Sequence, residues 1–306
     1  MSEIAFGGVE IGIPYGIGIE HESQLLAECD AIALLRQALD GGINLFDTAR
    51  MYGRSEALIG KAFKGRRDQV VISTKCFSLH DDQHRLLSGR DLRERIRSNL
   101  TQSLQALQTD YVDIFLLHQV DAEILHSTEV VQVLAELKRQ GLVRAVGASI
   151  YGVEQTRTAV QSSTWDVVQL AFNLMDQRAA ELLPIAQARG VGVMVRSVLL
   201  KGILSDRGEQ LHPQLMPVEQ HRQVYAELIK KGPFGTLSEL AIAFVLAHDT
   251  VSTALLGIDR MEYLEQALKI GTSTLDRETL ERARQLAYPD SEFLDLSKWK
   301  HEGWLP

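Results

Sequence analysis

The sequence predicts an α/β protein of one domain, folded as a (β/α)8 TIM barrel. Short apolar runs rich in β-branched residues alternate with amphipathic segments, and the alternation repeats eight times along the 306 residues. The runs are continuously apolar, as in strands that are buried on both faces. No proline- or serine-rich linker divides the chain. We therefore predict a single domain over residues 1–306, with a non-repeating C-terminal tail from about residue 289.

The eight apolar runs are expected to form the strands. They lie at residues 4–6, 43–46, 70–73, 112–117, 143–146, 167–170, 192–195 and 253–256. A longer excursion is expected at residues 205–217, after the seventh run.

The segments between the runs have apolar residues at helical spacing. Two clear stripes are Leu92, Ile96, Leu100, Leu104 and Leu107, and then Val130, Val133, Leu134 and Leu137. Ser55 is a candidate N-cap for a helix that follows it, and Gly41, Gly42 and Gly141 are expected to end helices.

A doubly wound sheet is the alternative for such an alternation. It would usually show a G-x-G-x-x-G turn that opens a helix directly after the first strand. Here the first run is followed by a segment with Gly7, Gly8, Gly12 and Gly16, which we expect to be a loop. The glycine pattern therefore favours the barrel.

The composition of the chain indicates which partners the protein can bind and which cellular compartment it suits. The 32 Lys and Arg against 40 Asp and Glu leave a net charge of −8, which argues against nucleic-acid binding. The two cysteines, Cys29 and Cys76, exclude a disulfide framework and suit a reducing compartment. No signal-peptide pattern opens the chain, and no apolar run approaches the ~20 residues that span a bilayer. We expect a cytoplasmic protein with no membrane partner, and nothing in the sequence indicates its oligomeric state.

Three predicted strands end in an ionisable side chain. Asp47 follows the second run, Lys75 the third and His118 the fourth, and Tyr52 lies in the loop after Asp47. Active sites of (β/α)8 barrels lie at the carboxyl ends of the strands, so these four residues are expected to meet at one mouth.

The four residue types together suit proton transfer. An ammonium beside a tyrosine stabilises its phenolate and lowers its pKa from the usual ~10. Asp47 would hold Lys75, and His118 would hydrogen-bond a reacting oxygen. Such a set can protonate an oxygen while a hydride arrives at its carbon, so a carbonyl is the natural electrophile. Each residue alone is more often structural, and it is their joint placement that favours catalysis.

The segment 46–56, FDTARMYGRSE, resembles the second-strand signature of the aldo-keto reductases. Segments 103–118, 147–149, 169–174 and 197–204 look like further landmarks of that family in the same order, so that the resemblance covers about residues 4–267. It implies that Tyr52 is the general acid/base, that Asp47 and Lys75 tune it, and that His118 binds and polarises the carbonyl.

The resemblance also implies a nicotinamide cofactor, NADP or NAD, extended across the barrel mouth. Helix N-terminal amides at its adenosine end would favour phosphate. The expected contacts are Ser149 and Gln169 for the carboxamide, Arg196, Ser197, Leu199, Gly202 and Leu204 near the nicotinamide and diphosphate, and Gly257, Asp259 and Arg260 for the adenosine end.

Several positions depart from the family pattern, and one is the pair Gln266-Ala267, where the family has Glu-Asn near the adenine. Ile150 replaces the usual Asn, and Arg196 replaces a Tyr that stacks on the nicotinamide. Arg196 could stack by its planar guanidinium or turn to the diphosphate. Asp259 stands where a basic residue often contacts the 2′-phosphate of NADP. An Asp could accept from a free ribose hydroxyl instead, while Arg260 could still bind the phosphate.

We therefore predict an NAD(P)-dependent oxidoreductase that interconverts a small carbonyl compound (an aldehyde, a ketone or a sugar) and its alcohol. A slow or inactive cofactor-binding regulatory subunit on the same barrel is one alternative. A metal-dependent hydrolase or isomerase is another, but only Asp47 and His118 qualify as ligands at strand ends, and we predict no metal site. Trp299 and Trp304 in the tail are expected to close over the substrate, with packing on the barrel as the alternative.

Overall fold

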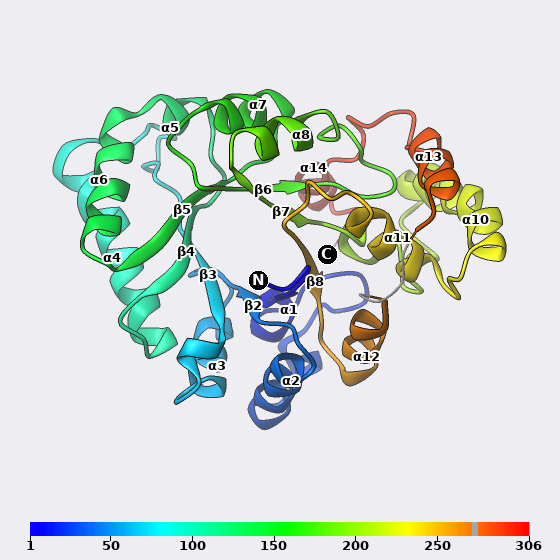
Figure 1. Ribbon diagram of the computed structural model, residues 1–306, viewed down its shortest axis with the longest axis horizontal. Coiled ribbons are helices and arrows are strands. Elements are labelled where there is room, and N and C mark those ends of the chain that lie inside the picture. The colour runs from blue at the N-terminus through cyan, green and yellow to red at the C-terminus, as the bar shows by residue number, and fades with distance from the viewer. Residues whose placement is uncertain (271–274, 306) are drawn as a thin grey trace.

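The computed structural model describes residues 1–270 and 275–305, and shows a closed barrel of eight parallel strands (Figure 1). The strands follow one another in chain order, and the last pairs with the first. They are β1 (Ile4–Gly7), β2 (Leu45–Asp47), β3 (Val71–Cys76), β4 (Val112–Leu117), β5 (Val143–Ser149), β6 (Val167–Ala171), β7 (Gly192–Arg196) and β8 (Thr253–Gly257). All eight predicted strands are confirmed, with ends that differ by at most three residues. Residues 271–274 and Pro306 of the predicted domain lie outside the described part.

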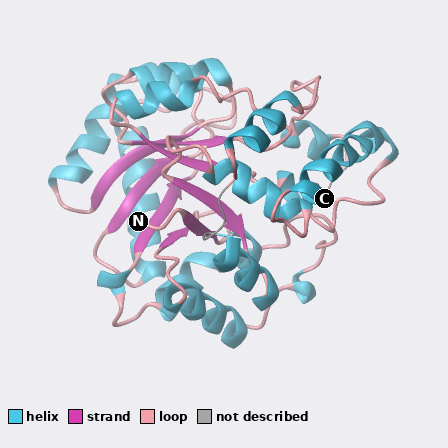
Figure 2. Ribbon diagram, turned by 45° about the vertical axis from the view of Figure 1, so that its right-hand side comes forward, coloured by secondary structure: helices cyan, strands magenta, loops and turns pink. Residues whose placement is uncertain are grey.

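Helices surround the strands, with further helices gathered beyond the ring on one side (Figure 2). The predicted apolar stripes of α4 and α6 are buried against the barrel, apart from the partly buried Leu104. The α-helices are α1 (Val9–Gly12), α2 (Glu28–Asp40), α3 (Ser55–Ala62), α4 (Gly89–Leu107), α5 (Ala122–His126), α6 (Thr128–Arg139), α7 (Val153–Gln161), α8 (Leu182–Ala188), α9 (Met216–His221), α10 (Ala226–Lys231), α11 (Leu237–Leu246), α12 (Met261–Ile270), α13 (Arg277–Gln285) and α14 (Leu296–His301). In the described residues, no helix is long and apolar enough to cross a membrane.

Two local predictions are wrong. Ser55 is the first residue of α3 rather than its N-cap, and its hydroxyl accepts a hydrogen bond from Thr48. The segment after β1 is not entirely loop, because it contains the one-turn helix α1. Four residues are too few to show a helical period, so the sequence pattern could not reveal this helix. The Gly8 N–H donates to the carbonyl of Asp47 and so ties this turn to the end of β2.

The interior of the barrel has an apolar floor and a polar rim. Leu45 and Asp47 lie on one face of β2 because side chains two residues apart share a face, and Leu116 and His118 follow the same alternation. The floor is a buried cluster of Ala5, Leu45, Ile114, Leu116, Met194 and Leu255. The rim at the carboxyl ends of the strands therefore carries the ionisable side chains.

The chain departs from the regular repeat in two places. Between β7 and α11 lie the single turn η3 (Leu200–Gly202) and then α9 and α10, so the predicted excursion is longer and more helical than expected. After α13 the tail returns across the barrel and forms α14, where Trp299 is fully buried (Figure 1).

Candidate active site

The ends of β2 and β3 hold a buried ion pair. The Lys75 ammonium lies 2.5 Å from Asp47 Oδ2, and it also donates to the Thr48 carbonyl at 2.9 Å. The other carboxylate oxygen, Asp47 Oδ1, accepts from Ser73 at 2.9 Å and from the Gln169 amide at 3.1 Å. Both charges are shielded from solvent, so these hydrogen bonds hold the pair in one geometry.

Tyr52 and His118 complete the predicted set of four. The Lys75 ammonium lies 4.9 Å from the centre of the Tyr52 ring. The Tyr52 and His118 rings meet edge to face, with their centres 6.1 Å apart. The structure thus brings together all four residues that the sequence placed at the ends of neighbouring strands.

The pKa of Tyr52 differs from the sequence-based expectation. The expected effect of Lys75 was a lowered pKa, but burial of the phenol, followed by the charge of Asp47, raises it above its usual value. The positive charge of Lys75 is itself paired with Asp47 at 2.5 Å. Tyr52 therefore keeps its proton at neutral pH and is a proton donor.

His118 is neutral at the same pH. Burial lowers its pKa to about 3, and the positive charges of Lys75 and Arg196 act in the same direction. A neutral imidazole can donate one N–H hydrogen bond to an oxygen in the cavity without carrying a charge there.

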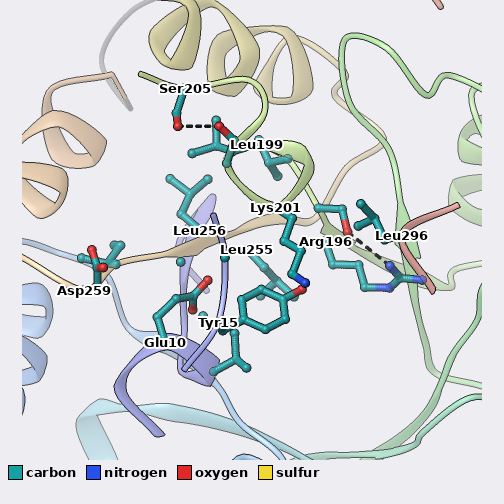
Figure 3. A pocket seen from close by; sticks show the side chains of 18 of the residues that line it. Glu10, Tyr15, Arg196, Leu199, Lys201, Ser205, Leu255, Leu256, Asp259 and Leu296 are labelled. Carbon is teal, nitrogen blue, oxygen red and sulfur yellow. Dashed lines mark hydrogen bonds between the residues drawn. The ribbon is translucent and has the colours of Figure 1, made fainter. Parts of the chain in front are cut away.

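A cavity of about 620 Å³ extends from these residues to the start of α12. Figure 3 shows its walls, with Arg196 and Leu296 at one side and Asp259 at the other. Seven of the ten predicted cofactor residues line it, namely Gln169, Arg196, Ser197, Leu199, Gly202, Gly257 and Asp259.

Three predicted cofactor residues do not line the cavity. Ser149 is buried and donates to Gln169 Oε1 at 3.3 Å. Leu204 is fully buried in the hydrophobic core, because the turn after η3 directs it inward. Arg260 lies outside the cavity wall, where it pairs with Asp259 at 3.4 Å.

Gln169 has a role that the sequence could not reveal. Its amide group donates to Asp47 and its carbonyl oxygen accepts from Ser149. Since Gln169 and Asp47 are 122 residues apart, only the closure of the barrel brings them together. Gln169 therefore orients the ion pair from the opposite side of the barrel.

The end of β7 forms one wall. Arg196 donates to the Ile150 carbonyl at 3.1 Å and to Ser197 Oγ at 3.2 Å, and its guanidinium stacks 4.1 Å from the centre of the Tyr151 ring. Beyond it, Ser197, Leu200 and Lys201 have φ angles of 57°, 45° and 59°, a left-handed conformation that costs energy in non-glycine residues. Strain of this kind is typical of segments that bind ligands.

The far end of the cavity is built around Asp259. Its carboxylate pairs with Arg207 at 3.0 Å, and Arg207 also lies 5.2 Å from the centre of the Tyr263 ring. Arg207 is not among the predicted site residues, and it lies in the excursion 52 residues before its partner. No local signal connects the two positions.

The tail contributes to the cavity, but not through its tryptophans. Leu296, Ser297 and Lys300 of α14 line the wall. Trp299 packs into the core beside Phe293, at 5.7 Å between ring centres, and Trp304 stacks on His212. The tail therefore shapes the cavity from one face of α14 while the other face packs on the barrel.

The residues of the cavity fit an extended nicotinamide dinucleotide. The cavity is long, it begins at the proton-transfer set, and it ends at the first turn of α12. Glu10 Oε2 is a buried polar atom that finds no hydrogen-bond partner among the described residues, and Glu10 lines the cavity wall. Residues 1–270 and 275–305 hold no group of three or more His, Cys, Asp or Glu side chains that could bind a metal.

Comparison with known proteins gives consistent matches. L-galactose dehydrogenase of Arabidopsis thaliana is 29% identical over 94% of this chain and 91% of its own length. An NADH-specific methylglyoxal reductase of Escherichia coli is 36% identical, over 54% of this chain and 55% of its own. An aldo-keto reductase from Klebsiella pneumoniae in complex with NADPH superposes with a TM-score of 0.72, at 25% identity over 94% of this chain and 91% of that one.

The family model of the aldo/keto reductases matches residues 3–287, which include the whole barrel and every residue of the predicted catalytic set. With the closed barrel and the cavity at its carboxyl end, this match shows that the chain belongs to the aldo/keto reductase family of NAD(P)-dependent oxidoreductases.

Proposed function

We propose that this enzyme reduces a small carbonyl compound to its alcohol, and catalyses the reverse oxidation, with Tyr52 as the general acid/base. The observation that carries the proposal is the buried Lys75–Asp47 pair beneath a protonated Tyr52, with a neutral His118 beside it. A bound dihydronicotinamide would supply the hydride.

Two residues would act directly on the carbonyl oxygen of the substrate. His118 donates a hydrogen bond that polarises the carbonyl, and Tyr52 donates its phenolic proton to the same oxygen. The Lys75 ammonium, 4.9 Å from the ring, stabilises the phenolate that remains. Asp47 holds the Lys75 ammonium in place. The product is an alcohol, with a proton on oxygen and a hydride on carbon.

Replacement of Tyr52 tests this role. Tyr52→Phe is expected to retain cofactor affinity and to lose turnover by at least the ~10²-fold that general acid/base catalysis contributes. Tyr15→Phe is the matched control, since it removes a second phenol from the same cavity without touching the Lys75–Asp47 pair. The first substrates to test are L-galactose and methylglyoxal, because these compounds appear in the names of two relatives.

Near-normal turnover of Tyr52→Phe would refute the assignment. If the unmodified protein bound the cofactor tightly but reduced no carbonyl in a broad screen of aldehydes, ketones and sugars, a regulatory subunit would replace the enzyme as the best interpretation. A complete lack of NADH and NADPH binding would refute the cofactor site itself.

We also infer a preference for NAD(H) over NADP(H). Asp259 presents a carboxylate at the start of α12, which can accept from a ribose hydroxyl but would repel a 2′-phosphate. Arg207, which could otherwise bind a 2′-phosphate, is already paired with Asp259 at 3.0 Å. The relative from Escherichia coli is NADH-specific by name, which supports the same choice.

Fluorescence titrations with NADH and NADPH test this preference. The unmodified protein is expected to bind NADH more tightly. Asp259→Ser should shift the ratio of the two Kd values towards NADPH by about tenfold or more, since a hydrogen bond to a charged group contributes about 1.5–3 kcal/mol. Tighter NADPH binding by the unmodified protein would instead assign Arg207 or Arg260 to the 2′-phosphate.

A cytoplasmic location is also proposed. Both cysteines are free, Cys29 at the surface and Cys76 in the interior, as suits a reducing compartment.

A further inference from the structure

Glu10 is a buried acid that the reaction does not use. It lies in α1, directly after β1, and its side chain lines the cavity between Asp259 and Tyr15 (Figure 3). Its Oε2 atom is shielded from solvent and has no hydrogen-bond partner in the described residues. An unpartnered buried oxygen is unfavourable, so a ligand that pairs with it would bind more tightly.

A glycine makes room for this carboxyl group. The ends of β1 and β8 pair at Gly7 and Gly257. A Cβ atom placed on Gly257 would lie 1.9 Å from Glu10 Oε1, so any side chain at the end of β8 would displace Glu10. The carboxyl group therefore rests against bare backbone, in the space where the cavity passes over the strand ends.

The charges around Glu10 favour its neutral form. Asp47 of β2 and Asp259 beyond β8 face it with negative charge, and the phenols of Tyr15 and Tyr52 lie nearby. Arg207 is the cation that acts on it, but Arg207 is bound to Asp259 at 3.0 Å. Burial is the largest effect, and together with these acids it outweighs a hydrogen bond from the backbone N–H of Glu10 and raises the pKa of the carboxyl group to about 8, so Glu10 is protonated at neutral pH.

The position of Glu10 identifies what its proton can meet. The proton-transfer set lies at one end of the cavity and Asp259 with Arg207 at the other, so the middle of a dinucleotide, its diphosphate, falls between them. Resting on the cofactor site proposed above, we propose that the protonated carboxyl group of Glu10 donates a hydrogen bond to the diphosphate of the bound cofactor. An ionised Glu10 would have no proton to donate and would repel the same group.

This assignment makes cofactor binding depend on pH. The competent, protonated fraction of Glu10 falls about tenfold between pH 7 and pH 9, and the apparent Kd rises by the same factor. Lys201, on the same cavity wall, has a pKa lowered to about 8 by burial and by the charge of Lys300, so it loses charge over the same range. The two contributions must be separated by experiment.

The test is a set of NADH fluorescence titrations from pH 7 to pH 9.5 on three proteins. In the unmodified enzyme and in Lys201→Arg, whose side chain stays charged, the Kd is expected to rise at least about tenfold over two pH units above neutrality. In Glu10→Gln, which is neutral at every pH and keeps an N–H donor, most of that rise should disappear.

Calorimetry of the unmodified enzyme and of Lys201→Arg provides a measurement that does not need the Gln variant to fold. NADH binding at pH 9, compared in buffers of different ionisation enthalpy, should take up close to one proton per site, against almost none at pH 7. No uptake at pH 9, or an equally steep rise of the Kd in a folded Glu10→Gln protein, would overturn the proposal. If the unmodified enzyme and Lys201→Arg bound neither NADH nor NADPH at any pH, the proposed cofactor site itself would be refuted. That result is distinct from a failure of the Glu10 assignment.

Discussion

The raised pKa of Glu10 has a consequence for folding that needs no cofactor. The pKa of this carboxyl rises from 4.5 in the unfolded chain to about 8 in the folded protein. Between these values the folded state binds the proton and the unfolded state does not, so the free energy of unfolding falls as the pH increases. Below pH 4.5 Glu10 is protonated in both states, so it no longer lowers the free energy of unfolding.

The size of the effect follows from the shift. One pKa unit corresponds to about 1.4 kcal/mol. The full shift therefore lowers the free energy of unfolding by about 5 kcal/mol once the pH exceeds 8. About 3 kcal/mol of this loss is expected between pH 5.5 and pH 8. In Glu10→Gln the side chain is neutral at every pH, so this variant should not lose stability in this way.

Urea unfolding at pH 5.5, 7 and 8.5 measures the prediction. The difference in unfolding free energy between Glu10→Gln and the unmodified protein should increase with pH, because all other titrating groups are common to both and cancel. Glu20→Gln, an exposed acid in the loop after α1, is the control and should show no such trend. A constant difference across the three pH values would show that Glu10 is ionised in the folded protein, and would refute the reasoning.

Two other predictions concern the catalytic set. Lys75→Met leaves the buried Asp47 carboxylate without its cation and should lower the unfolding free energy by about 3–5 kcal/mol, whereas Lys61→Met, which breaks an exposed pair with Glu28, should cost less than about 1 kcal/mol; equal losses would show that burial of the pair is unimportant. Because the pKa of His118 is lowered to about 3, kcat/KM should show no inflection between pH 5 and pH 7; an inflection near pH 6.5 that disappears in His118→Gln would show that the imidazole is protonated.

The fold could be predicted from the sequence because its signals are local. A strand buried on both faces needs a continuous apolar run, and a helix on a barrel needs an apolar stripe, whatever lies elsewhere in the chain. Asp47, Lys75 and His118 could be located for the same reason, since each follows such a run within two residues. The barrel then requires them to meet at one end.

Contacts between distant elements could not be predicted in this way. Gln169 reaches Asp47 across the barrel, and Arg207 reaches Asp259 from the excursion. Leu204 matches the family landmark in sequence, yet the turn that contains it directs the side chain into the core. In each case the direction of a side chain depends on backbone geometry that the sequence does not display.

The sequence by itself determined the order of strands and helices, and which ionisable residues stand at the mouth of the barrel. Only the tertiary structure decided their charge states. The nearness of Lys75 predicts a lowered pKa for Tyr52, yet its pKa is raised, and no pattern in the sequence marks Glu10 as an acid with a raised pKa. The physical reason is that a pKa depends on burial and on every charge within several ångströms. Those neighbours come from strands that are far apart in the chain and adjacent only in the closed barrel.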